Sequence, residues 1–566
     1  MSISGELREA EGEILARRPE HTIEPTLDRM AELVSVLGDP QRSYPVIHVT
    51  GTNGKTSTAR MIESLLRARG LRTGLFTSPH LTSIRERIVV DGQPVPAEAF
   101  VAAYDELAPY LALVDGRQAS QLSFFEVLTG MAFAIFADVP VDVAVIEVGL
   151  GGTWDATNVA DGAVAVVTPV SLDHTAYLGG TVEEIATDKA GIIKPGAVAV
   201  LAQQPLPAAE ALLRRVVTVG ASVVREGLEF GVLSRDLAVG GQRLDLRGLR
   251  GEYTDIVLPL FGAYQASNAA VALAAVEAFA AGTPLSGQSS EHEADRADET
   301  AGWPSDDDGS HSSAPADVRM DELDDGTPAV PPARPALDDA DPDAPVGALG
   351  QDLVREGFAS VTSPGRLEVV RRSPVVILDA AHNPAGMEAA MEALTEAFTF
   401  ASVIGVLAVS EDKDVAGILD QMEPVIAELV VTRNSSDRSM DPDKLAELAA
   451  SVFGAERVHA ARRLDDALEM AVGLADDASG EEGLTLTGVL VTGSVVTAGD
   501  ARLLLAPDRV EVDRADAHRA EQDRLDREER DREEREDWDG EDQDREEREA
   551  REDREYQDPG GAAGDE

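Results

Sequence analysis

Residues 45–57 decide the fold class of this chain and read PVIHVTGTNGKTS. Pro45–Val49 is an apolar run typical of a buried strand, and a helix is expected from near Thr58. A glycine turn between strand and helix brings backbone N–H groups close to phosphate oxygens, and a lysine here reaches the β and γ phosphates. The loop departs from the general phosphate-loop pattern, because Val49 stands where that pattern has its first glycine. The expected nucleotide contacts are Gly51, Thr52, Asn53, Gly54, Lys55 and Thr56.

Outward from this loop, strand-like runs alternate with helical periodicity, which predicts an α/β fold with a parallel sheet. We expect residues 1–282 to form an N-terminal P-loop ATP-binding domain and residues 351–505 a smaller, Rossmann-like α/β domain. Further strands are expected in the first domain at Val141–Val148, Ala163–Thr168 and Ala197–Leu201. In the second domain they are expected at Val375–Asp379, Ser402–Val409, Glu428–Thr432 and Gly488–Thr492.

Two segments have a composition that does not form a core. Residues 283–350 are rich in Asp, Ser and Pro, and they cannot bury enough apolar surface to offset the entropy of ordering. We predict a disordered insertion or linker there. Residues 506–566 are mostly Asp, Glu and Arg without an apolar seam, which predicts a disordered tail or a lone solvated helix.

Charge and composition exclude several functions. The 566 residues carry a net charge of −55, and only five of the 49 basic residues are lysines. Such a surface repels nucleic acid phosphates, and no apolar run approaches the roughly 18 to 20 residues of a membrane span. The absence of cysteine excludes disulfides and thiolate metal sites. We expect a cytoplasmic protein from a salt-accumulating, halophilic organism. The alternative is that acidic segments alone inflate the charge.

Further polar residues follow expected strands, where an α/β sheet presents functional groups. Glu147 ends an apolar run before a glycine turn, and such a carboxylate suits Mg²⁺. Asp173 and His174 follow the strand that ends at Thr168. Four of the five lysines lie in motif-like blocks of a chain that otherwise uses arginine, which indicates positions where Arg cannot substitute.

Several blocks, taken in order from about residue 45 to 505, resemble the folylpolyglutamate synthase and dihydrofolate synthase family of the Mur ligase superfamily. The blocks are TGTNGKT at 50–56, TSPHL at 77–81, FFE at 124–126, DKAGIIKPG at 188–196, PGR at 364–366 and DAAHNP at 379–384. The chain departs from the family pattern at Thr153 and Trp154, where the family has Arg, and at Tyr264, where it has His.

The resemblance implies roles for individual residues. Ser78 and Glu147 are the implied ligands of a first Mg²⁺, and His174 and a carbamylated Lys189 those of a second. Lys55, His174 and Lys189 are therefore the expected catalytic residues. Asn268, Arg366 and Asp379 are the implied further nucleotide contacts, and the substrate side is expected to include His80, Phe124, Glu126 and His382.

The implied reaction is ATP-dependent amide formation between L-glutamate and dihydropteroate or a reduced folate, through an acyl phosphate and by a monomer. One alternative is a Mur-type ligase with another carboxylate substrate. The other is a P-loop switch ATPase, whose ATP hydrolysis would not depend on an acid and an amine.

We predict that folding and activity need roughly molar salt, because a net charge of −55 repels itself strongly when the Debye length exceeds about 10 Å. Dilution into low-salt buffer is expected to inactivate the protein. Full activity after long dialysis into low-salt buffer without ligands would contradict the halophilic interpretation.

Overall fold

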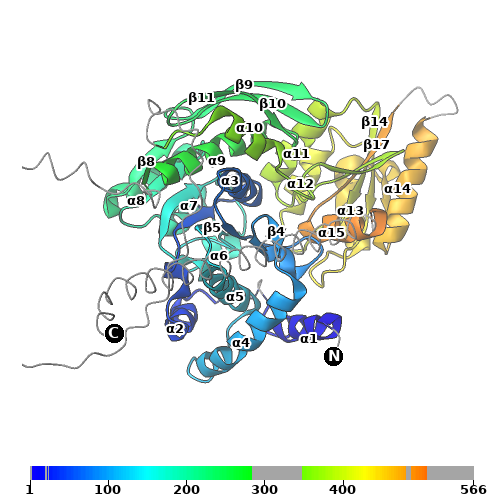
Figure 1. Ribbon diagram of the computed structural model, residues 1–566. Coiled ribbons are helices and arrows are strands. Elements are labelled where there is room, and N and C mark those ends of the chain that lie inside the picture. The colour runs from blue at the N-terminus through cyan, green and yellow to red at the C-terminus, as the bar shows by residue number, and fades with distance from the viewer. Residues whose placement is uncertain (1–2, 20–21, 23, 283–346, 480–485, 507–566) are drawn as a thin grey trace, which may run out of the picture.

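The computed structural model describes residues 3–19, 22, 24–282, 347–479 and 486–506 (Figure 1). The insertion predicted at 283–350 lies outside these ranges up to residue 346, and the tail predicted at 506–566 lies outside them from residue 507. The described residues form an N-terminal and a C-terminal unit, each built on its own sheet.

The N-terminal unit centres on an eight-stranded sheet in the order β4-β3-β2-β5-β1-β6-β7-β8. Strand β1, which precedes the glycine loop, pairs in parallel with β5 and β6, and only β3 and β4 pair antiparallel to their neighbours. The predicted parallel sheet is therefore confirmed. The strands are β1 (Val46–Thr50), β2 (Thr73–Phe76), β3 (Ile88–Val90), β4 (Gln93–Pro94), β5 (Val143–Glu147), β6 (Gly162–Val167), β7 (Val198–Leu201) and β8 (Ser222–Arg225).

Helices cover both faces of this sheet, because its central strands are apolar on both sides. One face carries α1 (Ile3–Leu15), α2 (Asp28–Val36), α4 (Ala97–Asp115), α5 (Phe124–Asp138), α7 (Val182–Lys189) and α8 (Leu206–Val219). The other face carries α3 (Lys55–Ala68), α9 (Ala263–Gly282) and α10 (Gln351–Ala359). The short helix α6 (Thr175–Leu178) lies in the loop between β6 and α7.

A three-stranded antiparallel sheet, not expected from the sequence, packs over α9 (Figure 1). Its strands are β9 (Gly231–Ala238), β10 (Gly241–Arg247) and β11 (Glu252–Leu258). Helix α9 thus lies between two sheets, and its side chains from Gln265 to Ala280 are almost all buried. This position explains why α9 is rich in alanine and apolar all round.

Helix α10 packs on α3 of the N-terminal unit, although the prediction placed it in the second domain. Val354 and Phe358 are fully buried in the N-terminal core, and Ser64 donates a hydrogen bond to the Gly357 carbonyl (2.7 Å). The domain limits remain a prediction. This packing leads us to place the boundary after Val361 in preference to residue 351.

The C-terminal unit has a six-stranded sheet in the order β12-β13-β17-β14-β15-β16, parallel except for β12. The four predicted strands are present, while the edge strands β12 and β16 were missed. The strands are β12 (Glu368–Arg372), β13 (Val375–Leu378), β14 (Ser402–Leu407), β15 (Glu428–Val431), β16 (Val458–Ala460) and β17 (Thr487–Thr492). The helices are α11 (Pro384–Ala397), α12 (Val415–Met422), α13 (Pro442–Phe453), α14 (Leu464–Ser479) and α15 (Val495–Leu505).

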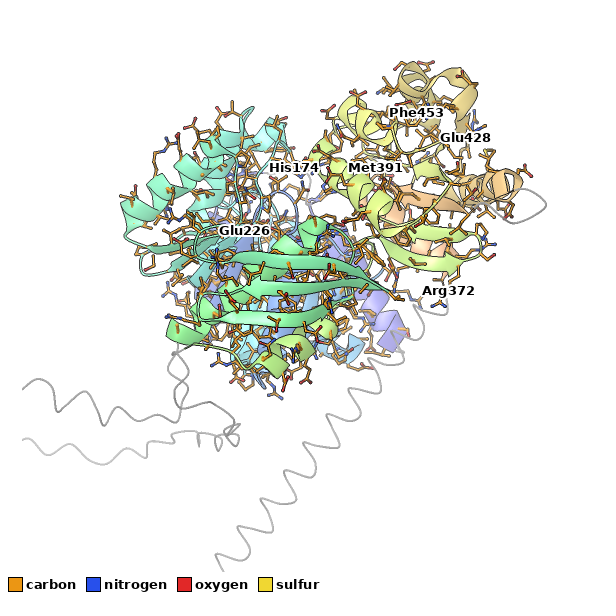
Figure 2. The ribbon with its side chains drawn as sticks, turned by 90° about the horizontal axis from the view of Figure 1, so that it is seen from above. His174, Glu226, Arg372, Met391, Glu428 and Phe453 are labelled. Carbon is orange, nitrogen blue, oxygen red and sulfur yellow. The ribbon has the colours of Figure 1, made fainter. Side chains whose placement is uncertain are left out.

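The carboxyl ends of strands in both sheets face the space between the units, where His174 lies (Figure 2). In the ranges that the structure describes, we find no helix with the length and apolarity needed to cross a membrane.

Strand β1 contains a buried histidine that makes folding sensitive to acid. His48 is fully buried, and its Nε2 lies 2.9 Å from Thr157 Oγ1. Burial, together with the charge of Lys194, lowers the pKa of His48 to about 3. The folded protein therefore keeps His48 neutral at pH values where an unfolded chain protonates it.

We predict that the free energy of unfolding falls by about 2 kcal/mol between pH 7 and pH 5 on account of His48. In the unfolded chain this histidine has a pKa near 6.5 and takes up a proton in that range, whereas in the folded protein it stays neutral. The loss continues as the pH falls toward 3. His48→Gln should remove this part of the pH dependence, measured by denaturant unfolding at both pH values. His459→Gln changes a partly exposed histidine and should leave the acid sensitivity in place. An unchanged pH slope in His48→Gln would contradict the assignment.

Candidate active site

The loop between β1 and α3 needs glycine at two positions. Gly51 has φ +147°, and a Cβ there would lie 1.8 Å from Thr168 Oγ1. Gly54 has φ +87°, and a Cβ there would lie 2.6 Å from Asn268 Oδ1. The loop therefore packs tightly between the end of β6 and the start of α9, with the N-terminus of α3 opening at Lys55.

Lys55 folds back over this loop. Its ammonium donates to the Thr52 carbonyl (3.1 Å), and in the described part of the chain no carboxylate lies within ion-pair distance of it. Burial lowers the pKa of Lys55, and the charges of Glu147 and Asp173 oppose that shift. A cation held in this way is suited to phosphate oxygens, which would restore its charge balance.

Glu147, at the end of β5, joins three elements of the N-terminal unit. Its side chain is buried and accepts hydrogen bonds from Thr56 Oγ1 (2.8 Å) and from the Ser78 backbone N–H (3.2 Å). Burial raises the pKa of Glu147, while the neighbouring Lys55 lowers it. One carboxylate beside the Thr56 hydroxyl group leaves other positions open to phosphate and water, which is how proteins commonly bind Mg²⁺.

Lys189 and His174 lie on the other side of the loop, around a cavity of about 30 Å³. Lys189 ends α7, is buried, and donates to the Gly51 carbonyl (2.8 Å). Burial and the charge of Lys55 lower the pKa of Lys189 to about 7. His174 has a left-handed backbone (φ +49°), and burial lowers its pKa to about 3, which keeps the imidazole neutral.

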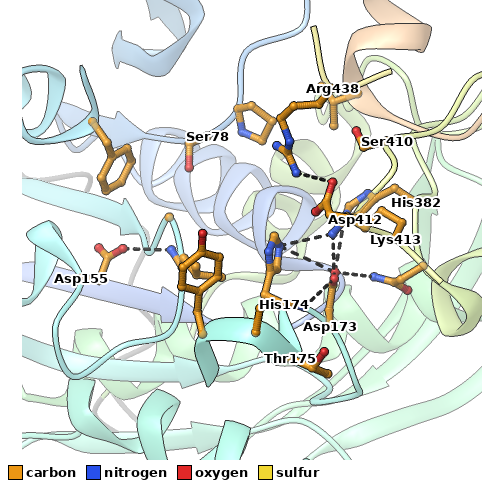
Figure 3. Close-up of a pocket in the computed structure, with 18 of the residues that line it drawn as sticks. Ser78, Asp155, Asp173, His174, Thr175, His382, Ser410, Asp412, Lys413 and Arg438 are labelled. Carbon is orange, nitrogen blue, oxygen red and sulfur yellow. Dashed lines mark hydrogen bonds and ion pairs between the residues drawn. The ribbon is translucent and has the colours of Figure 1, made fainter. Parts of the chain in front are cut away.

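Three side chains of the C-terminal unit converge on Asp173 of the N-terminal unit (Figure 3). Lys413 Nζ lies 2.7 Å from the carboxylate, Asn383 Nδ2 donates at 3.0 Å, and His382 Nε2 lies at 3.5 Å. Asn383 also exchanges hydrogen bonds with Asn53 of the glycine loop (3.1 and 3.2 Å). The C-terminal unit thus contacts the loop and its neighbour directly.

A cavity of about 1130 Å³ opens beside this contact, between the two units. One end has apolar walls that include Phe125, Leu150 and Trp154. The other end carries polar and charged groups of the C-terminal unit (Figure 3), namely His382, Ser410, Asp412, Lys413, Arg438 and Ser494. His174 and Asp173 line the cavity between the two ends, so a long molecule with a flat apolar head would have its acid group near the glycine loop.

Comparisons with known proteins agree with this geometry. Residues 49–276 match the Mur ligase middle domain, and residues 365–495 match the Mur ligase, glutamate ligase domain. The chain is 46% identical over 510 residues to the dihydrofolate synthase/folylpolyglutamate synthase of Mycobacterium tuberculosis, covering 87% of this chain and 92% of the relative. It is 33% identical to the folylpolyglutamate synthase of Lacticaseibacillus casei, covering 70% and 78%.

The chain belongs to the folylpolyglutamate synthase and dihydrofolate synthase family. It is an ATP-dependent ligase with the Mur ligase fold. A solved Mycobacterium tuberculosis folylpolyglutamate synthase with ADP has a TM-score of 0.75 and 44% identity, covering 89% of this chain and 99% of that one. A solved FPGS–AMPPCP–folate complex has a TM-score of 0.65 and 28% identity, covering 88% and 99%. The switch-ATPase alternative is not favoured by these relatives.

Of the two phenylalanines in the FFE segment, the structure places the second at the large cavity, whereas the first was expected there. Phe124, the expected substrate contact, is only 5% exposed and packs in the core with the Arg87 guanidinium 4.9 Å from its ring centre. Phe125 lines the large cavity instead. The first residue of α5 faces the core here, because α5 packs against α2 and α4, while the second faces the cavity. A substrate contact by Phe124 remains a prediction.

Glu126 and His80 have structural partners. Glu126 pairs with Arg29 (3.0 Å) and accepts a hydrogen bond from the Ser123 N–H (2.7 Å), which caps α5. Glu126 still touches the cavity wall, whereas His80 is not among the residues that line it. His80 Nδ1 accepts a hydrogen bond from Arg87 (2.9 Å), which links it to the Phe124 ring. Substrate roles for Glu126 and His80 remain predictions.

The remaining predicted nucleotide contacts are Asn268, Arg366 and Asp379. Asn268 touches the loop at Gly54 and donates to Gln265 (3.1 Å). Arg366 lines a second cavity of about 1020 Å³, and its charge lowers the pKa of Lys55 and of Glu147. Both oxygens of the buried Asp379 accept backbone N–H groups, from Leu367 (3.0 Å) and Ala381 (2.8 Å). In this structure Asp379 therefore anchors the segment that carries Arg366, and its nucleotide contact remains a prediction.

The structure also shows where the residues lie that depart from the family pattern. Trp154 is part of the apolar wall of the large cavity, and Thr153 Oγ1 donates to the Asp188 carbonyl (2.9 Å). Tyr264 packs on the core of the C-terminal unit. Lys413 and Arg438 were not predicted as site residues. Lysine scarcity pointed to Lys413, but nothing in the sequence showed that it would face Asp173.

Proposed function

We propose that this ligase joins the amino group of L-glutamate to a carboxyl group of dihydropteroate or a reduced folate, with ATP as the phosphoryl donor. The observation that supports it best is the 1130 Å³ cavity, whose apolar end suits a flat heterocycle and which, at Asp173 and His174, adjoins the small cavity lined by Gly51, Thr52 and Lys55 of the glycine loop. The names of the relatives support the same substrates.

The acid is activated at the glycine loop. An acceptor carboxylate oxygen attacks the γ-phosphorus of ATP, the bond to the β–γ bridging oxygen breaks, and an acyl phosphate and ADP form. Lys55 balances charge on the transferred group, and the backbone around Gly51 and Gly54 holds the other phosphates. No protein nucleophile takes part in this step.

The amine then displaces phosphate. The nitrogen of glutamate attacks the acyl carbon, the carbon–oxygen bond to phosphate breaks, and the nitrogen loses its proton as the amide forms. The polar end of the cavity suits the carboxylates of glutamate, because His382, Ser410, Arg438 and Ser494 lie there. Contact between the units keeps water from the acyl phosphate.

Two Mg²⁺ ions are part of the proposal. Glu147, Thr56 and Ser78 fit the first, since the buried Glu147 carboxylate accepts from the Thr56 hydroxyl group of the phosphate loop and from the backbone N–H of Ser78. His174 and Lys189 fit the second only if Lys189 is modified, because an ammonium repels a cation. Among the described residues, no group of three His, Asp or Glu side chains forms a ready metal site. When bound, Mg²⁺ neutralises charge on the phosphoryl oxygens.

The environment of Lys189 favours its carbamylation. A pKa of about 7 gives a large fraction of free amine at neutral pH, and only the free amine adds to CO₂. The resulting carbamate carries an anionic oxygen at the cavity that His174 also lines. This modification turns an unfavourable buried cation into a metal ligand.

The proposal includes three further features. The strongly acidic composition supports a halophilic, salt-requiring protein. A cytoplasmic location and a monomeric state complete the proposal.

Synthesis can be tested directly. The protein is incubated in molar salt with ATP, Mg²⁺, L-glutamate and either dihydropteroate or tetrahydrofolate, and the products are identified by mass spectrometry. We expect a glutamyl amide and one phosphate per amide, with each substrate required. ATP turnover that needs neither the acid nor glutamate would overturn the proposed function.

We predict different outcomes for the two neighbouring phenylalanines. Phe125→Ala should raise the KM for the acceptor by about tenfold, through the loss of an aromatic wall, with little loss of stability. Phe124→Ala should lower the free energy of unfolding by about 3 kcal/mol, because it leaves a buried cavity. Steady-state kinetics and denaturant unfolding of both variants check this. The reverse pattern would restore Phe124 as the substrate contact.

Lys189→Arg is expected to lose nearly all synthesis while it still binds ATP, because Arg keeps a positive charge but cannot form that carbamate. Lys189→Ala should be equally inactive, and acetate should partly restore it by occupying the vacated space. Acetate should not help the arginine variant, which serves as the matched control. Near wild-type synthesis in Lys189→Arg would eliminate the carbamate.

A further inference from the structure

Asp173 is the point where the two units are joined by a buried ion pair. The carboxylate belongs to the loop after β6, and the Lys413 ammonium that reaches it belongs to the loop after β14. The side chains of Asp173 and Lys413 are only 8% and 9% exposed. Asn383 and His382 approach the same carboxylate at 3.0 and 3.5 Å.

The charges of Asp173 and Lys413 balance each other only while the two units are in contact. At this contact the charge of the Asp173 carboxylate is balanced by the Lys413 ammonium at 2.7 Å, and the Asn383 amide donates to it at 3.0 Å. A buried charge that loses its partner is strongly unfavourable, so removal of either partner disfavours contact between the units. Neither residue belongs to the hydrophobic core of its own unit.

The ion pair also lies next to His174 of the second candidate Mg²⁺ site. His174 follows Asp173 directly, and its Nε2 lies 3.5 Å from Lys413 Nζ. Asn383 connects the same group to Asn53 of the phosphate loop. Movement of Lys413 away from Asp173 would therefore release its contacts with Asp173 and His174 (Figure 3), which lie next to the Asn383 contact with the loop.

We propose that Lys413 is a positioning residue of the ligase reaction, which pairs with Asp173 to hold the C-terminal unit against the phosphate loop. The pair keeps the large cavity closed to water while the acyl phosphate exists and aligns the two halves of the cavity. This inference rests on the proposed function for its chemical consequence, while the closing contact itself is independent of the acceptor.

The chain offers a matched control. Arg235 of β9 and Glu396 of α11 also form an ion pair between the units, but it is more exposed, with side chains 22% and 35% exposed. Exposed pairs contribute little, particularly at high salt. Arg235→Ala therefore removes a contact between the units without touching the cavity residues.

Closure can be measured by a distance between labels. The chain has no cysteine, so Val217→Cys on α8 and Glu447→Cys on α13 supply two unique sites, one on each unit. Distances between spin labels are compared with and without AMPPCP and Mg²⁺. We expect Lys413→Met and Asp173→Asn to broaden and lengthen the distance, whereas Lys413→Arg and Arg235→Ala keep the wild-type distribution.

Catalysis supplies a second readout. With the substrates of the proposed reaction, Lys413→Met should lower the rate of amide synthesis by about 100-fold and release more than one phosphate per amide, because water reaches the acyl phosphate. Lys413→Arg should restore the one-to-one ratio. The double variant of Asp173→Asn and Lys413→Met should be no worse than the more severe single variant, because both remove the same interaction.

The outcomes separate the two proposals. Wild-type label distances and a one-to-one phosphate ratio in Lys413→Met would overturn the positioning role. Failure of the wild-type protein to make a glutamyl amide would count against the proposed function alone, since the label distances with AMPPCP would still show whether Lys413 closes the units.

Discussion

The hydrogen bond from the Lys189 ammonium to the Gly51 carbonyl ties the phosphate loop to the end of α7, and much of the site depends on it. Gly51 has no room for a side chain because Thr168 packs against it, so the loop has one path between β1 and α3. That path sets the direction of α3 and brings Thr56 to the Glu147 carboxylate. The ends of β1, β5 and β6 and the helices α3 and α7 thus meet at the phosphate loop.

This point gathers positive charge in a strongly acidic chain. Lys55 is half-buried and Lys189 is buried. The charges of Lys413 and Arg366 contribute to the lowered pKa of Lys55, and the charge of Lys55 contributes to that of Lys189. Glu147 and Asp173 supply negative charge near Lys55, and Asp188, Asp173 and Asp155 supply it near Lys189. Such a cluster of cationic side chains is suited to binding a polyanion, and ATP is the polyanion that the family uses. High salt would screen the long-range repulsion between a chain of charge −55 and ATP, while the short-range contacts inside the site are screened much less.

Contact between the units completes the site. The glycine loop, the first candidate cation site and the apolar cavity wall all belong to the N-terminal unit. The charged end of the cavity belongs to the C-terminal unit, and Asn53, Asn383, Asp173 and Lys413 join the two. A ligase of this kind gains from such a division, because substrates can enter before the units come together and the reactive acyl phosphate forms only afterwards.

The phosphate loop and the parallel sheet could be predicted from the sequence, because short-range spacing and apolar runs specify them. Glu147 and His174 were expected after the ends of apolar runs, whereas the role of Lys189 was implied by the resemblance to the family. The β9–β11 sheet was missed, and so were the strands β2, β3, β4, β8, β12 and β16, since short or half-exposed strands leave a weak pattern. Phe124 and Phe125 are adjacent and chemically identical, and only the packing of α5 decided which of them lines the cavity. Likewise, the sequence by itself determined that Asp173 and Lys413 were unusual, but they are 240 positions apart. Only the tertiary structure decided that they form one buried ion pair, because long-range pairing depends on how two separately folded sheets come to face each other.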